Sequence, residues 1–182
     1  MKHESAPTHL DVKAFAQAGS RIAGHDLLSN YERLMHEIQG PGNEIVLKWS
    51  AQGEFRSDAA GTAQVWLHLA LDTHLPLTCQ RCLGLLDFPV AVKQSYRFVA
   101  DEEVAEAQDD TSEEDVLVLS RDFNLAALIE DEVLLALPLI PRHETCPVAV
   151  KLAVEDPGFE AASAEKRHPF AVLAKLQGDK AG

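Results

Sequence analysis

Three stretches of the chain alternate apolar and polar residues with a period of two, and this alternation constrains the fold more than any other feature. It runs through residues 44–52, 63–72 and 88–98. Successive side chains of a β-strand point to opposite faces of its sheet, so each stretch predicts a strand with one buried and one solvated face. Because short connections join the three strands, we expect an antiparallel meander.

Helical patterns flank the predicted strands. Residues 10–18 are weakly helical with Asp11 as N-cap, and residues 26–38 repeat apolar side chains at spacings of four, three and four. Gly24 helps to form a turn between these two helices, and a third helix starts from Asp122 as its N-cap. The predicted fold class is therefore α+β: an antiparallel β meander flanked by short helices, with an acidic loop and a C-terminal tail helix.

The charge of the chain is concentrated in one segment. The formal net charge is -13, but residues 101–135 hold 13 acids and Arg121 as their single base. A net charge of -13 spread over the whole chain would argue against binding to a nucleic acid, whose phosphates are negative. Because the rest of the chain is close to neutral, most of this argument does not apply. The sequence does not, however, show a basic patch. Residues 101–115 hold nine acids and no aromatic residue, which predicts a mobile loop ahead of a short strand at 116–119.

The length of 182 residues fits one domain with a tail. We expect a single α+β domain over 1–155 and a linker over 156–182, which carries a short helix at 169–176. No run of 18 apolar residues is present, and the N-terminus lacks the apolar core of a signal peptide. Three cysteines do not make a secreted disulfide framework, so a cytoplasmic location is expected.

The sharpest motif is the Cys-x-x-Cys at Cys79 and Cys82, placed between the second and third predicted strands. Two thiolates three residues apart on a tight turn can coordinate one Zn²⁺ from the same side. His143 and Cys146 supply a His-x-x-Cys pair, which completes the ligand count of a structural zinc site. About 60 residues separate the two pairs, so no recognised spacing links them. Their pairing is inferred from the residue types alone.

Two alternatives to zinc remain open for these cysteines. A thioredoxin-type redox site needs its first cysteine at a helix N-terminus after a parallel strand, whereas Cys79 falls inside a meander. The other alternative is a pair of reduced cysteines that only shape a turn.

Polar faces of the predicted strands carry Trp66, His68, Lys93 and Arg97. Aromatic and basic side chains on one sheet face can stack on bases and neutralise phosphates, so these residues are candidate RNA contacts. The plainer interpretation is an ordinary exposed sheet face, or a face that a helix covers.

Acidic residues offer a further candidate site. The run 130–132, together with Glu102 and Glu103, could hold Mg²⁺ or form a carboxylate dyad. Consecutive acids on a helix point in different directions, so a solvated face is the favoured interpretation. No phosphate-binding glycine loop, serine-hydrolase elbow or zinc-protease motif occurs in the sequence.

Three stretches, in order and spacing, resemble the YceD family of large ribosomal RNA subunit accumulation proteins. They are the Cys-Gln-Arg-Cys segment at 77–83, the acidic helix ending in Ala-Leu-Pro at 130–138, and Pro-Phe-Ala-Val-Leu at 169–173. Many relatives carry a second Cys-x-x-Cys after the Ala-Leu-Pro helix, and His143 stands where the first of those cysteines would be. The resemblance implies a role in synthesis, processing or stability of 23S ribosomal RNA, with no established enzymatic activity.

The resemblance implies partners among the large ribosomal subunit precursor, 23S rRNA and a ribosomal protein. Contacts are then expected also through Arg81 and through one face of the tail helix, formed by Phe170, Leu173 and Leu176. The second hypothesis is an adaptor whose acids at 101–115 bind a basic ribosomal protein. The third is an rRNA-processing enzyme, for which the sequence shows no convergent general acid and base. No membrane association and no small-molecule substrate are expected.

Overall fold

The structure is a computed structural model that describes residues 5–57, 61–109, 111–112 and 114–150. Contacts between Cα atoms group Met1–Pro147 into one compact unit and Val148–Gly182 into a second. The linker and helix expected over 156–182 lie outside the described residues, so they and the domain boundary at 155 stay predictions. No helix in the described part of the chain is long and apolar enough to cross a membrane.

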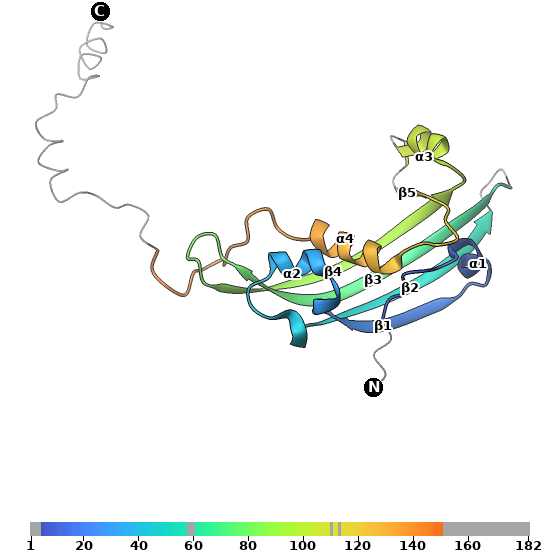
Figure 1. The fold of residues 1–182 in the computed structure, drawn as a ribbon. Helices are drawn as coiled ribbons and strands as arrows, with labels where there is room; N and C mark the ends of the chain where they lie inside the picture. Colours follow the sequence, from blue (N-terminus) through green and yellow to red (C-terminus); the bar gives the residue numbers. More distant parts are fainter. Residues whose placement is uncertain (1–4, 58–60, 110, 113, 151–182) are drawn as a thin grey trace, which may run out of the picture. The chain divides into compact units, whose positions relative to one another are not determined.

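A five-stranded sheet forms the body of the first unit (Figure 1). The strands follow each other in chain order, and β1 to β4 pair antiparallel, which confirms the predicted meander. The last strand joins β4 in parallel, and it confirms the short strand expected near 116–119. The strands are β1 (Arg21–Leu27), β2 (Val46–Ser57), β3 (Ala63–Thr78), β4 (Leu85–Val99) and β5 (Asp115–Val118).

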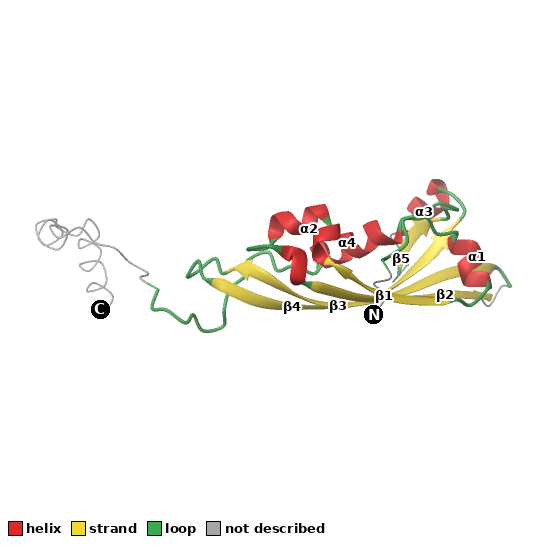
Figure 2. Cartoon of the chain, turned by 60° about the horizontal axis from the view of Figure 1, so that its bottom comes forward, coloured by secondary structure: helices red, strands yellow, loops and turns green. Residues whose placement is uncertain are grey.

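Helices cover one face of this sheet. In both views, α2 (Glu32–Glu37) and α4 (Leu125–Leu135) lie over the same side (Figure 2). Their apolar side chains join one core with α1 (Val12–Gln17) and the inward positions of the strands. We call the opposite side the outer face; the alternation along the strands gives it exposed and half-buried polar side chains.

The first helix packs unusually close to the sheet. A Cβ atom added at Gly53 of β2 would lie 2.7 Å from the Cα atom of Ala16, so only glycine allows this approach. Asp11 caps α1 as predicted, since its carboxylate accepts a hydrogen bond from the N–H of Ala14.

The helix predicted over 26–38 is wrong in its first half. Asp26 and Leu27 belong to β1, Leu28–Asn30 form a short 3-10 helix, and Glu32–Glu37 form the helix α2. The carboxylate of Asp26 is buried and accepts hydrogen bonds from the Tyr31 hydroxyl and the Trp49 indole, which hold it beside β2. Tertiary contacts therefore override the helical spacing, and Gly24, expected in a turn, lies inside β1.

Part of the loop predicted over 101–115 is helical, because Glu102–Asp109 form the helix α3, while the mobility expected of this segment stays a prediction. Asp101 accepts a hydrogen bond from the N–H of Val104, as an N-cap does. Glu102 and Glu103 follow in the first turn, where negative charge complements the helix dipole. Acidic residues that suggested an unstructured segment therefore cap this helix and stabilise its first turn.

The N-cap of α4 differs from the predicted one by two residues. Asn124 accepts the hydrogen bond from the N–H of Ala127, whereas the Asp122 carboxylate contacts the ring of His9. Both residue types suit an N-cap, and the sequence alone does not distinguish the two positions.

Candidate metal centre

The structure brings the two predicted ligand pairs together. Cys79 and Cys82 lie at the turn between β3 and β4, while His143 and Cys146 lie in the segment that follows α4 (Figure 1). The four candidate ligand atoms are all within 4.8 Å of one another. Among the described residues, this is the one group of His, Cys, Asp and Glu side chains close enough to share a metal ion.

Backbone hydrogen bonds shape the turn that holds the first pair. The Cys79 N–H donates to the Gly84 carbonyl over 2.9 Å, and the Leu83 N–H donates to the Cys79 carbonyl over 2.8 Å. Leu83 adopts a φ of +58°, the left-handed region that is strained for a leucine. The turn is also joined to the second ligand segment, because the Gln80 N–H donates to the Pro141 carbonyl.

Arg81, between the two cysteines of the turn, positions the second pair. Its Nε donates to the Cys146 sulfur over 3.0 Å, and its Nη2 donates to the carbonyls of His143 and Glu144 over 3.0 and 3.2 Å. The guanidinium thus holds both the sulfur and the backbone of the 143–146 segment. These contacts already occupy Arg81, whose expected role in RNA contact stays a prediction.

The ring of His143 is oriented for ligation. Its Nε2 lies 3.0 Å from the Leu85 carbonyl oxygen, which can only accept, so Nε2 carries the proton and donates it. With Nε2 protonated, the neutral form of the ring has a bare Nδ1, and this atom lies 3.4 Å from the Cys82 sulfur. A ring N–H bonded to a backbone carbonyl is the usual support of a metal-ligating histidine.

The spacing of the ligand atoms matches a tetrahedral zinc ion. With Zn–S bonds of about 2.3 Å, two thiolates of one tetrahedron lie about 3.8 Å apart, and a thiolate and an imidazole nitrogen about 3.6 Å apart. The Cys79 and Cys146 sulfurs are 3.9 Å apart, and the Cys82 sulfur is 3.4 Å from His143 Nδ1. A cation therefore fits between the four groups with little rearrangement.

The thiols of this cluster are not equivalent. Burial alone would raise the pKa of Cys79, but hydrogen bonds from the backbone of Cys82, His143 and Arg81 lower it to about 5. The Gly84 backbone lowers the pKa of Cys82, yet burial and the neighbouring thiols outweigh it and raise that pKa. One thiolate is thus stabilised by N–H groups, while a second meets like charge that a divalent cation would offset.

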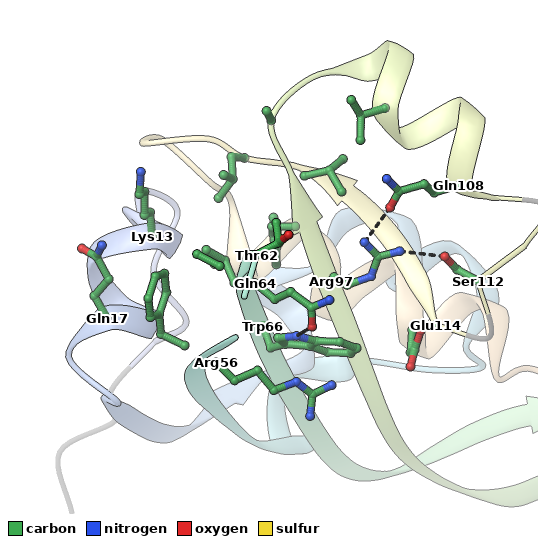
Figure 3. Close-up of a pocket in the computed structure, with 18 of the residues that line it drawn as sticks. Lys13, Gln17, Arg56, Thr62, Gln64, Trp66, Arg97, Gln108, Ser112 and Glu114 are labelled. Atoms are coloured by element: carbon green, nitrogen blue, oxygen red, sulfur yellow. Dashed lines mark hydrogen bonds between the residues drawn. The ribbon is translucent and has the colours of Figure 1, made fainter. Parts of the chain in front are cut away.

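The predicted RNA contacts share the outer face, as expected. The strand register pairs Trp66 with Arg97, and both line one pocket (Figure 3). Trp66 is only 4% exposed, and the Arg56 guanidinium lies 4.0 Å from its ring centre. Arg97 donates to Gln108 and Ser112, so it ties the α3 region to β4.

His68 and Lys93 lie further along the same face. His68 is half-buried, and its two ring nitrogens contact Glu54 and Ser95. Lys93 is exposed. Whether RNA contacts any of these residues stays a prediction, as do the contacts expected at Phe170, Leu173 and Leu176, which lie outside the described residues.

The acidic run at 130–132 holds helices together. Arg33 of α2 donates to Glu130 over 2.9 Å and to Asp131 over 2.6 Å, which joins α2 to α4. Glu102 and Glu103 belong to α3, and no metal-binding group among the described residues includes any of these acids. Sequence reasoning missed both Arg33 and the positioning role of Arg81, because an isolated arginine gives no signal of its distant partners.

Comparisons with known proteins agree with this picture. No solved structure matches the chain. The sequence model of the family described as large ribosomal RNA subunit accumulation protein YceD matches residues 67–177, a span that contains both ligand pairs and most of β3. Since this match covers more than half of the 182 residues, the chain belongs to the YceD family.

Proposed function

We propose that this protein is a non-enzymatic, cytoplasmic factor in the synthesis, processing or stability of 23S rRNA during assembly of the large ribosomal subunit. The match to the family model over residues 67–177 carries the proposal. The description of that family supports a role in accumulation of large-subunit rRNA.

We further propose that Cys79, Cys82, His143 and Cys146 hold one structural Zn²⁺. The spacing of the four groups and the orientation of His143 support it. Four protein ligands fill a tetrahedral ion and leave no position for a substrate, which suits a structural rather than a catalytic site. The ion would fasten the end of the β3–β4 hairpin to the segment after α4.

A second candidate function is an adaptor for a basic ribosomal protein. The observation in its favour is α3, whose exposed Glu102, Glu103 and Glu106 offer negative charge on an ordered helix. An acidic helix can attract and shield a basic client. This function is compatible with a role in 23S rRNA accumulation.

Depletion of the protein tests the main proposal. We expect mature 23S rRNA to fall relative to 16S rRNA in the depleted strain, and the wild-type chain supplied from a plasmid to restore the ratio. The two RNAs are measured by quantitative sequencing and on gels. A ratio that stays unchanged under every growth condition would remove the proposed function.

A further inference from the structure

A shallow trough crosses the middle of the outer face. One hollow of about 510 Å³ is lined by Lys48, Ser50, Ala70 and Lys93, among others. A second, of about 310 Å³, shares Ser50, Ala70 and Lys93 and adds Arg21. Because the two hollows share these residues, they form one trough with small side chains on its floor and three cations along it.

The cations of the trough have no partners of their own. Arg21, Lys48 and Lys93 are exposed, and within the described part of the chain their side chains make no ion pair or hydrogen bond. They stand on different strands, so Lys48 and Lys93 are two strand spacings apart and Arg21 and Lys93 are three. With about 4.8 Å per spacing and an offset of two residues, about 7 Å, along the strands in each pair, the Cα atoms are about 12 and 16 Å apart.

The outer face is positive although the chain is strongly negative. The strand register places five Lys or Arg side chains and three Asp or Glu side chains of β1 to β4 on this face. Glu54 is paired with both His68 and Arg56, and Asp87 is paired with His74, which leaves Asp72 opposite Lys48. The whole chain carries -13, so the positive balance is local to this face.

The chemistry of the trough favours a nucleic-acid strand over a protein. Protein interfaces are built around large apolar or aromatic anchors and are depleted in charge at their centre. Here the centre is Ser50 and Ala70, between cations, and Trp66 is buried under Arg56. A positively charged groove that follows the backbone is the common feature of proteins that bind single strands.

We propose that this trough binds the backbone of single-stranded RNA, with Arg21, Lys48 and Lys93 contacting phosphates. The proposal rests on the proposed function, since it names the partner through which the protein supports 23S rRNA. The half-buried ring of His68 also lines the trough. Recognition therefore depends on phosphates and tolerates any base sequence.

Binding of a fluorescein-labelled, mixed-sequence RNA of about 20 nucleotides to the full chain tests this proposal by anisotropy at several salt concentrations. Three phosphate contacts on a single strand predict a slope of log K against log salt of about -2. The double variant Lys48→Gln/Lys93→Gln keeps one contact, so we expect a slope of about -0.7 and binding weakened about tenfold.

The matched control is Arg121→Gln/Arg142→Gln, which removes two exposed cations outside the outer face. It should bind the RNA like the wild type. Absence of wild-type binding, or equal loss in both double variants, overturns the proposal. A duplex of the same RNA that binds more tightly than the single strand also overturns it, as does loss of a protein partner by the Lys48/Lys93 variant while RNA binding is unaffected.

Failure of this proposal and failure of the proposed function give different results. If depletion lowers 23S rRNA but the wild-type chain does not bind RNA, the proposed function stands and the trough does not. If RNA binding depends on the trough but depletion leaves the 23S ratio unchanged, the trough proposal stands and the proposed function does not. If the Lys48→Gln/Lys93→Gln variant fully restores the ratio, RNA binding in the trough is not what supports 23S rRNA.

Discussion

The candidate metal centre and the trough differ in how their polar groups are satisfied. At the metal centre, Arg81, His143 and the three thiols contact one another or nearby backbone groups. In the trough, Arg21, Lys48 and Lys93 are exposed and have no such partners among the described residues. A closed network favours stability of one conformation, whereas unpaired cations are free to contact a partner. The two regions should therefore respond to mutation in opposite ways.

Removal of the metal should have the largest effect on stability. An ion present at a thousand times its Kd stabilises the fold by about 4 kcal/mol. For a protein of this size, that corresponds to about 10 °C in Tm. We expect about one zinc per chain by elemental analysis, and a Tm lowered by this amount after treatment with a chelator.

The variant Cys79→Ser/Cys82→Ser supplies the control for chelation. It should contain no zinc, melt at the lower temperature and show no further change when the chelator is added. Purified protein without zinc, together with a wild-type Tm that the chelator does not alter, would contradict the metal centre.

Arg81 should come next, because it positions ligands without being one. Replacing it by methionine removes its bonds to the Cys146 sulfur and to the His143 carbonyl. Loss of such supporting hydrogen bonds typically weakens metal binding 10- to 100-fold, so we expect a change in zinc affinity of about that size. Competition with a chromophoric chelator measures it. Arg142→Met, an exposed arginine in the same segment, should leave the affinity unchanged.

Leu83 offers a smaller effect of the opposite sign. Its left-handed backbone is strained for a leucine, and its side chain is 71% exposed, so little burial is lost on truncation. We expect Leu83→Gly to raise the free energy of unfolding by about 0.5–1 kcal/mol in denaturant titration. Leu85→Gly is the matched control: this residue is 59% exposed in a regular strand, and glycine there should lower stability. If Leu83→Gly also destabilises, the strain at this turn is not relieved by glycine.

The parts of the fold that could be predicted from the sequence are those specified by a residue pattern within one segment. The alternation along β2, β3 and β4 is a local property, and it predicted the meander. The strand β1 was missed because its identity depends on contacts of Asp26 with Tyr31 and Trp49, which are distant in sequence or hidden in a helical spacing. The acids of α3 were misread because composition suggests disorder, while their order, after Asp101, specifies a helix start.

The same distinction applies to the candidate metal centre. The four candidate ligands could be named from residue types and from two short spacings, and the structure places them within 4.8 Å. The hydrogen bonds of His143 to Leu85 and of Arg81 to Cys146 could not be predicted, because each joins residues about 60 positions apart in the sequence. Groups that support ligands are specified by the fold, and they have no spacing of their own in the sequence.

The smallest effect on stability should come from the trough, and it is the sharpest test of the comparison. Exposed lysines without ion pairs contribute little to folding, so Lys48→Gln/Lys93→Gln should change the free energy of unfolding by less than about 0.5 kcal/mol. Removing repulsion between nearby cations would even favour a slight gain. The same variant is expected to lose most of its RNA binding, which separates it from every change at the metal centre. Urea titration of the variant beside Arg121→Gln/Arg142→Gln measures the difference. A loss above 1 kcal/mol specific to the trough variant would mean that these lysines support the sheet itself, and the contrast between the two regions would then be lost.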